Sequence, residues 1–227
     1  MSGMMAGTWA VIAKDLRLAC ARGQGPVQAV LLGLLLVFIF SLSAAPGEHC
    51  SVQQGMAIFW LCSSFAVVLI FAMLFRFEAE NDTGTALLLS PLPVQGLWLG
   101  KTLAGLMILL GCQVFFLPAS VVFLDLSWNA SPLLLALAIF GVDLGLCIVS
   151  GLVGAMGQGH GSRDALLTII IFPLQVPLLL SGIRIGVGLM QGAELAALQD
   201  WLGMVLAFDA VFAGAALFLF PHVFRGE

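Results

Sequence analysis

Two carboxylic acids, Asp143 and Asp209, lie inside long apolar runs of this 227-residue sequence. An ionisable side chain is costly in lipid, so each is a candidate for a proton relay, for the acid pair of an intramembrane protease, or for a hydrogen bond between helices. The protease requires Gly-x-Gly-Asp, whereas this chain has FGVD at Asp143. We favour the structural role. Two more polar residues in apolar runs, Gln113 and Gln175, are expected to bind neighbouring helices rather than to line a path.

Imidazoles and thiols, which bind metals and haem iron, form no motif in this chain. His49, His160 and His222 have no second ligand at a fixed spacing and are interpreted as surface residues. The five cysteines are scattered, without the close pairs of a metal or redox site. Cys50 is the one expected to face an oxidising compartment, and it is predicted to be a free thiol. We therefore expect no directly bound cofactor.

The sequence QGLWLGKT at 95–102 comes close to a phosphate-binding P-loop. The motif needs a glycine where Gln95 stands, and no predicted strand precedes it. Nucleotide binding is not expected here, so any ATP must bind to another chain. Lys101 is instead expected to extend towards the lipid phosphates at the start of a membrane helix.

The composition shows what kind of element must carry these side chains. Hydrophobic residues make up 61% of the chain and charged residues 9%, whereas a soluble domain has about a quarter charged residues. Most of the surface must therefore face lipid. Helices are expected, because an open sheet edge would leave backbone groups unpaired. A crossing needs about 20 apolar residues, and six runs qualify within one transmembrane domain, 1–227. They are roughly residues 27–45, 56–75, 97–124, 133–156, 165–189 and 201–224.

The basic residues orient the six spans. Seven of the eight fall on one side of the membrane, and only Arg184 tends the other way. By the positive-inside rule both termini are cytoplasmic. The seven are Lys14, Arg17, Arg22, Arg76, Lys101, Arg163 and Arg225.

Residues 4–22 are predicted to form a helix that lies along the inner membrane surface. Apolar residues recur there at helical spacing, and the charged residues at 14, 15 and 17 lie mostly off that face. The apolar positions are Trp9, Ile12, Leu16 and Ala19.

The connection after the second span, residues 76–95, is the most charged part of the chain. Residues 81–83 are good helix N-cap types, and Ser90-Pro91 would stop a helix. The sequence therefore predicts a short cytoplasmic helix from about Thr83 to Leu89, held between two spans. Such a helix could receive force from a motor protein; an ordinary hydrophilic connection is the alternative.

Part of this pattern has a counterpart in a known family. The residues concerned are Arg76, Glu80, the LLLSPLP of 87–93, Gly100 and Lys101, with the glycine-rich turn 154–163 and the FPLQVP of 172–177. The pattern resembles the membrane subunits of type-two ABC exporters. It is most similar to the CcmB family, the haem-exporter permeases of cytochrome c maturation. The family's glutamate just ahead of the leucines is missing here, where Gly84-Thr85-Ala86 stands.

The resemblance implies a non-catalytic permease subunit of the bacterial inner membrane. ATP would be hydrolysed on a separate CcmA-like subunit, and haem would be the handled or transported substrate. The implied complex holds two copies of this chain, with a CcmC-like haem-handling protein, a CcmD-like single-span helper and a CcmE-like haem chaperone. Its other contact is membrane lipid, and nucleic acid is not implied.

On this basis the coupling segment is expected to dock the ATPase, and the inner turn at 157–163 is a second possible contact. The docking residues are Glu78, Glu80, Asp82, Leu87, Leu88, Ser90 and Pro91; those of the inner turn are Gly159, His160 and Arg163. One alternative is an ABC permease for a lipid or drug. Another, from a different class, is an ion-driven carrier that uses Asp143 and Asp209.

Overall fold

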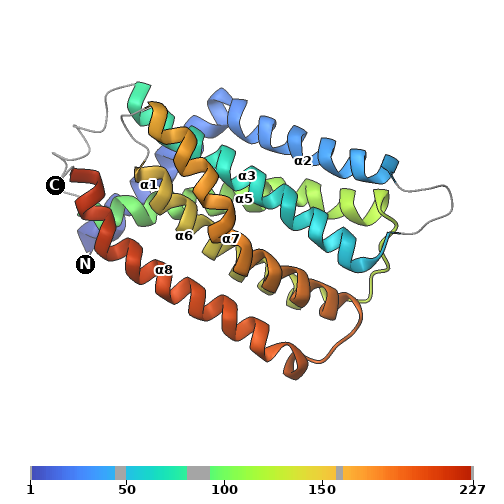
Figure 1. The fold of residues 1–227 in the computed structure, drawn as a ribbon. Coiled ribbons are helices and arrows are strands. Elements are labelled where there is room, and N and C mark those ends of the chain that lie inside the picture. The colour runs from blue at the N-terminus through green and yellow to red at the C-terminus, as the bar shows by residue number, and fades with distance from the viewer. Residues whose placement is uncertain (1, 44–49, 81–92, 157–160, 226–227) are drawn as a thin grey trace.

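The computed structural model describes residues 2–43, 50–80, 93–156 and 161–225, and these segments are mostly helical (Figure 1). The elements are α1 (Ser2–Arg22), α2 (Gln24–Ser43), α3 (Val52–Glu80), α5 (Val94–Phe123), α6 (Pro132–Met156), α7 (Gly161–Met190), the 3-10 helix η1 (Leu195–Leu198) and α8 (Gln199–Arg225). The predicted short helix from about Thr83 to Leu89 lies outside the described residues.

Among the described residues, six helices are long and apolar enough to cross a membrane: α2, α3 and α5 to α8. This confirms the predicted all-α membrane bundle. Figure 1 shows α1 at the end of the bundle where α8 finishes. We call this the α1 end, and the opposite end, where α2 finishes and α3 begins, the far end. The predicted orientation places the α1 end in the cytoplasm.

Helix α3 is the centre of the bundle. It contacts α2, α5, α6 and α7, and most of its membrane-crossing length is buried, whereas α2 and α8 face outwards along most of theirs. Among its fully buried side chains are Phe59, Trp60, Phe71 and Leu74. Because lipid tails are as apolar as these side chains, the packing depends on close van der Waals contact rather than on the exclusion of water.

Helix α7 approaches α3 through the spacing Gly182-x-x-x-Gly186, which permits close helix packing. A Cβ atom added at Gly182 would lie 2.6 Å from Cε2 of Trp60, and one at Gly186 would meet the side chain of Met56. Both glycines are therefore used for packing within this chain.

The helices on either side of residues 81–92 are longer than the predicted spans. Helix α3 continues beyond Phe75 to Glu80, so Glu78 belongs to the helix. Helix α5 begins directly after Pro93, whose φ of −62° and ψ of 141° are extended. Proline suits this place, because the first backbone donors of a helix have no partner within it. Glu78 and Lys101 are thus carried by regular helices close to the predicted coupling segment.

We predict that Gly182→Ala destabilises the protein by about 1–3 kcal/mol, because the new methyl group would overlap the buried ring of Trp60. The measurement is unfolding in detergent, followed by circular dichroism. Gly111→Ala is the matched control, since nothing lies within 4 Å of a Cβ atom added there. Equal stability of the two variants would contradict the close packing of α3 and α7.

Candidate functional site

A group of buried charges lies where α1 crosses the ends of α3 and α5. The side chain of Lys101 on α5 is 0% exposed, and those of Asp15 on α1 and Glu78 on α3 are 1% and 3% exposed. Nζ of Lys101 is 2.8 Å from Oε1 of Glu78 and 3.5 Å from Oδ2 of Asp15. It also donates a hydrogen bond of 3.2 Å to the carbonyl of Leu74. One buried cation therefore connects three helices.

Lys14 completes this group from its outer edge. Its Nζ is 3.1 Å from Oδ1 of Asp15 and 3.2 Å from Oε1 of Glu78, and its side chain is 37% exposed. Burial alone would lower the pKa of Lys14, but the two carboxylates outweigh this and raise it above its usual value. Lys14 is therefore charged at neutral pH. We call Lys14, Asp15, Glu78 and Lys101 the charge cluster; its formal charges cancel.

The packing of α1 on α5 brings the cluster together. A Cβ atom added at Gly100 would lie 2.9 Å from Cβ of Val11 and 3.2 Å from the carbonyl oxygen of Thr8. The backbones therefore pass close to one another beside Lys101. The absence of a side chain at Gly100 is what permits this approach.

The buried face of α1 differs from the predicted one. Its residues recur at intervals of three or four, as one helix face requires, but Asp15 lies at its centre and Trp9 is 64% exposed. The expectation that Asp15 lies mostly off the apolar face was wrong, because Asp15 is buried against the protein together with Ile12 and Ala19 of that face. The contact of Trp9 with the inner membrane surface stays a prediction. The buried residues are Thr8, Val11, Ile12, Asp15 and Ala19.

The prediction that Lys101 extends to the lipid phosphates was also wrong. Its ammonium group lies between two carboxylates and 5.0 Å from the ring centroid of Phe75, a distance at which a cation is attracted to a ring face. An acid at position 15 and another at 78 have no fixed spacing from position 101. No local pattern could therefore identify Lys101 as buried.

The structure places only part of the predicted ATPase-docking set. Glu78 is buried and paired within the chain, and Glu80 is the last residue of α3. Arg163 lies in the first turn of α7. The remaining predicted contacts fall outside the described residues and stay predictions: Asp82, Leu87, Leu88, Ser90, Pro91, Gly159 and His160.

Asp143 takes part in a hydrogen-bond network in the middle of the bundle. Nε2 of Gln113 on α5 donates to Oδ1 of Asp143 on α6 over 2.8 Å and to Oγ of Ser63 on α3 over 3.0 Å. Asp143 is 0% exposed, and its Oδ2 has no hydrogen-bond partner in the part of the chain that the structure describes. This arrangement joins three helices, as the structural interpretation of Asp143 and Gln113 expects.

Gln175 on α7 forms a second network beside the first. Its Oε1 accepts a hydrogen bond of 2.6 Å from Ser64 on α3, and its Nε2 donates one of 3.1 Å to Oγ of Ser150 on α6. Serine residues at neighbouring positions of α3 thus serve two networks. A polar group in lipid needs such a partner, because no water is available to replace it.

Asp209 on α8 is placed differently. It is 8% exposed, and its Oδ1 lies where a Cβ atom at Gly145 of α6 would be. This oxygen has no hydrogen-bond partner among the described residues. Asp143 faces α5 and Asp209 faces α6, so the contacts do not join the two acids into one network. Their use by an ion-driven carrier stays a hypothesis.

The sequence matches one known family and three relatives over most of its length. The family model described as CcmB protein matches residues 6–226. Heme exporter protein B of Pseudomonas aeruginosa is 24% identical over 197 residues, covering 87% of this chain and 88% of that protein. The proteins of the same name from Paracoccus denitrificans and Rhodobacter capsulatus are 27% and 26% identical over 178 and 212 residues. These matches cover 76% and 88% of this chain, and 79% and 90% of the relatives.

We predict that Lys101→Met destabilises the protein by about 3–5 kcal/mol, because Asp15 and Glu78 lose the cation that neutralises them while they stay buried. Detergent unfolding measures the loss. Lys14→Met is the control, and it should have a clearly smaller effect because Lys14 is partly exposed. If the two variants unfold alike, Lys101 does not hold the cluster together.

Proposed function

Because the chain belongs to the CcmB family, we propose that it is the membrane subunit through which an ATP-hydrolysing partner drives a haem-export complex. The family match and the three relatives support a haem-exporter permease of cytochrome c biogenesis. With six membrane-crossing helices, the chain is a multi-pass protein of the bacterial inner membrane.

The proposal assigns ATP to a separate, CcmA-like subunit. Residues 95–102, the sequence closest to a P-loop, lie within α5, which begins at Val94. A P-loop instead wraps the phosphates with backbone N–H groups ahead of its helix, and its lysine must reach them. Lys101 is fully buried and paired with Glu78. Both observations argue against nucleotide binding at residues 95–102.

The charge cluster is the observation that carries the coupling proposal. The predicted docking segment leaves α3 just after Glu78 and joins α5 shortly before Lys101. These two residues bind one another over 2.8 Å, and Asp15 adds α1 to the pair. A charge pair in a low-dielectric interior is much stronger than the same pair in water. A push on the segment would therefore move α1, α3 and α5 together, and α3 contacts most of the bundle.

In the proposed complex, two copies of this chain bind the ATPase, mainly through 76–95 and secondarily through 157–163. A CcmC-like protein and a CcmD-like helper stand beside them. ATP hydrolysis would drive haem export and release the haem-loaded CcmE-like chaperone. The family resemblance is the support for these partners. The geometry contributes the charge cluster, which joins α1, α3 and α5 at the α1 end.

Replacing both Glu80 and Pro91 by alanine should lower recovery of the ATPase subunit in pull-down from membranes by roughly ten-fold, which corresponds to about 1.4 kcal/mol of docking energy. Assembly of c-type cytochromes should fall with it. The matched control is Gln53→Ala with Asn129→Ala, two exposed polar residues at the far end. Unchanged ATPase recovery, with the protein still in the membrane, would refute the docking site. Normal cytochrome assembly after deletion of the chain would instead favour the lipid or drug exporter.

The variants Asp143→Asn and Asp209→Asn distinguish the ion-driven carrier from the proposed ABC permease subunit. Asparagine keeps an oxygen that can accept the hydrogen bond from Gln113, but it cannot bind a proton reversibly. We expect both variants to retain at least about half of cytochrome assembly, because a structural role does not require the acids to ionise. A two-fold loss corresponds to less than about 0.5 kcal/mol. Abolished function in either variant, together with proton-dependent transport by the isolated chain, would support the carrier.

A further inference from the structure

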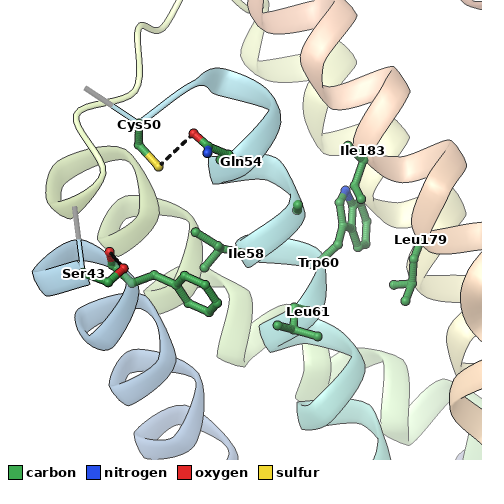
Figure 2. Close-up of a pocket in the computed structure, with 10 residues that line it drawn as sticks. Ser43, Cys50, Gln54, Ile58, Trp60, Leu61, Leu179 and Ile183 are labelled. Carbon is green, nitrogen blue, oxygen red and sulfur yellow. Dashed lines mark hydrogen bonds between the residues drawn. The ribbon is translucent and has the colours of Figure 1, made fainter. Parts of the chain in front are cut away.

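A cavity of about 610 Å³ lies between α2 and α7 towards the far end, with α3 as its back wall (Figure 2). Its deeper part is apolar and includes Leu61 of α3 and Leu179 of α7, and the rings of Phe40 and Trp60 line it as well. In the predicted orientation it belongs to the outer leaflet. We call it the outer groove.

Polar groups gather at one end of the outer groove. Ser43 is the last residue of α2, Cys50 lies two residues ahead of α3, and Gln54 lies in the first turn of α3. Figure 2 shows the Cys50 thiol beside the Gln54 amide, with Sγ 3.8 Å from Oε1. Cys50 is a partly exposed free thiol. At 1.5 Å per residue, Leu61 lies about 14 Å along α3 from Val52, the first residue of the helix. The groove therefore suits a molecule with an apolar body and a polar end.

We propose that the outer groove binds haem, with the macrocycle against its apolar wall and the thiolate of Cys50 on the iron. The inference rests on the proposed function, which makes haem the substrate of the complex. Ligation forms an Fe–S bond, and the thiol proton passes to water at the mouth. The carboxylate edge of the haem stays at the polar end.

The lining favours haem over a phospholipid tail. A flat aromatic ligand gains from the ring of Phe40, which is 40% exposed, because aromatic contacts add to simple area burial. Cysteine thiolate is an established axial ligand of haem iron. A lipid tail would use the apolar wall but would gain nothing from a thiol at the mouth. The positions of the thiol and of the Phe40 ring together point to a metal-bearing planar ligand.

The test uses the full chain in nanodiscs, titrated with haem and, separately, with metal-free protoporphyrin. Binding is followed by the Soret band and by quenching of tryptophan fluorescence. Ala57→Phe fills the groove from α3 and should lower the affinity for both ligands by roughly ten-fold or more. Ala207→Phe, an exposed position on α8, is the matched control and should change neither. If Ala57→Phe does not fold, Ile183→Phe narrows the same groove from α7.

The thiol is tested by Cys50→Ser. This variant should remove the thiolate signature from the Soret spectrum and lower the affinity for haem several-fold, while metal-free protoporphyrin binds as before. Cys20→Ser, at an exposed cysteine of α1, should leave both unchanged. Haem binding that survives Ala57→Phe, or a co-purified phospholipid that Ala57→Phe displaces without affecting haem, would overturn the proposal. No ATPase is present in this assay, so its failure would leave the coupling proposal standing.

Discussion

Lys101 carries a charge into an apolar bundle, and this constraint determines how the α1 end is built. A buried ammonium group is tolerated only beside carboxylates and hydrogen-bond acceptors. Glu78 supplies one carboxylate from α3, Asp15 supplies another from α1, and the Leu74 carbonyl accepts a further hydrogen bond. α1 is therefore attached to the bundle by charge as well as by packing. The attachment lies beside the connection that the proposed ATPase would contact.

The same need for partners shapes the middle of the bundle. Ser63 and Ser64 of α3 reach two different glutamines, and through them Asp143 and Ser150 of α6. Hydrogen bonds between helices fix their rotation and register, because a polar group displaced into lipid finds no water. α3 is thus bonded directly to partners on α5 and α7, and these partners in turn bond α6. A rigid central helix is suited to carrying a displacement from one end of the bundle to the other.

Helix α3 links the two sites that the proposals concern. Glu78 lies near its end, in the charge cluster, and Cys50 and Gln54 stand at its start, at the mouth of the outer groove. The groove is bounded by α2 and α7, and both contact α3. A movement of α3 driven from the cluster would therefore change the separation of the groove walls. If both proposals hold, this movement is the physical route from ATP hydrolysis on the partner subunit to a ligand in the outer groove.

The sequence by itself determined the membrane class, the six crossings and the family resemblance, because hydropathy, charge bias and a short motif such as LLLSPLP are local properties. It also identified Gln113, Gln175, Asp143 and Asp209 as intramembrane polar residues, though not their partners. Only the tertiary structure decided that Lys101 is buried with Asp15 and Glu78, that Asp15 lies on the packed face of α1, and that three helices enclose the outer groove. These relations join residues far apart in the chain, and hydrophobic periodicity does not specify which helix faces meet.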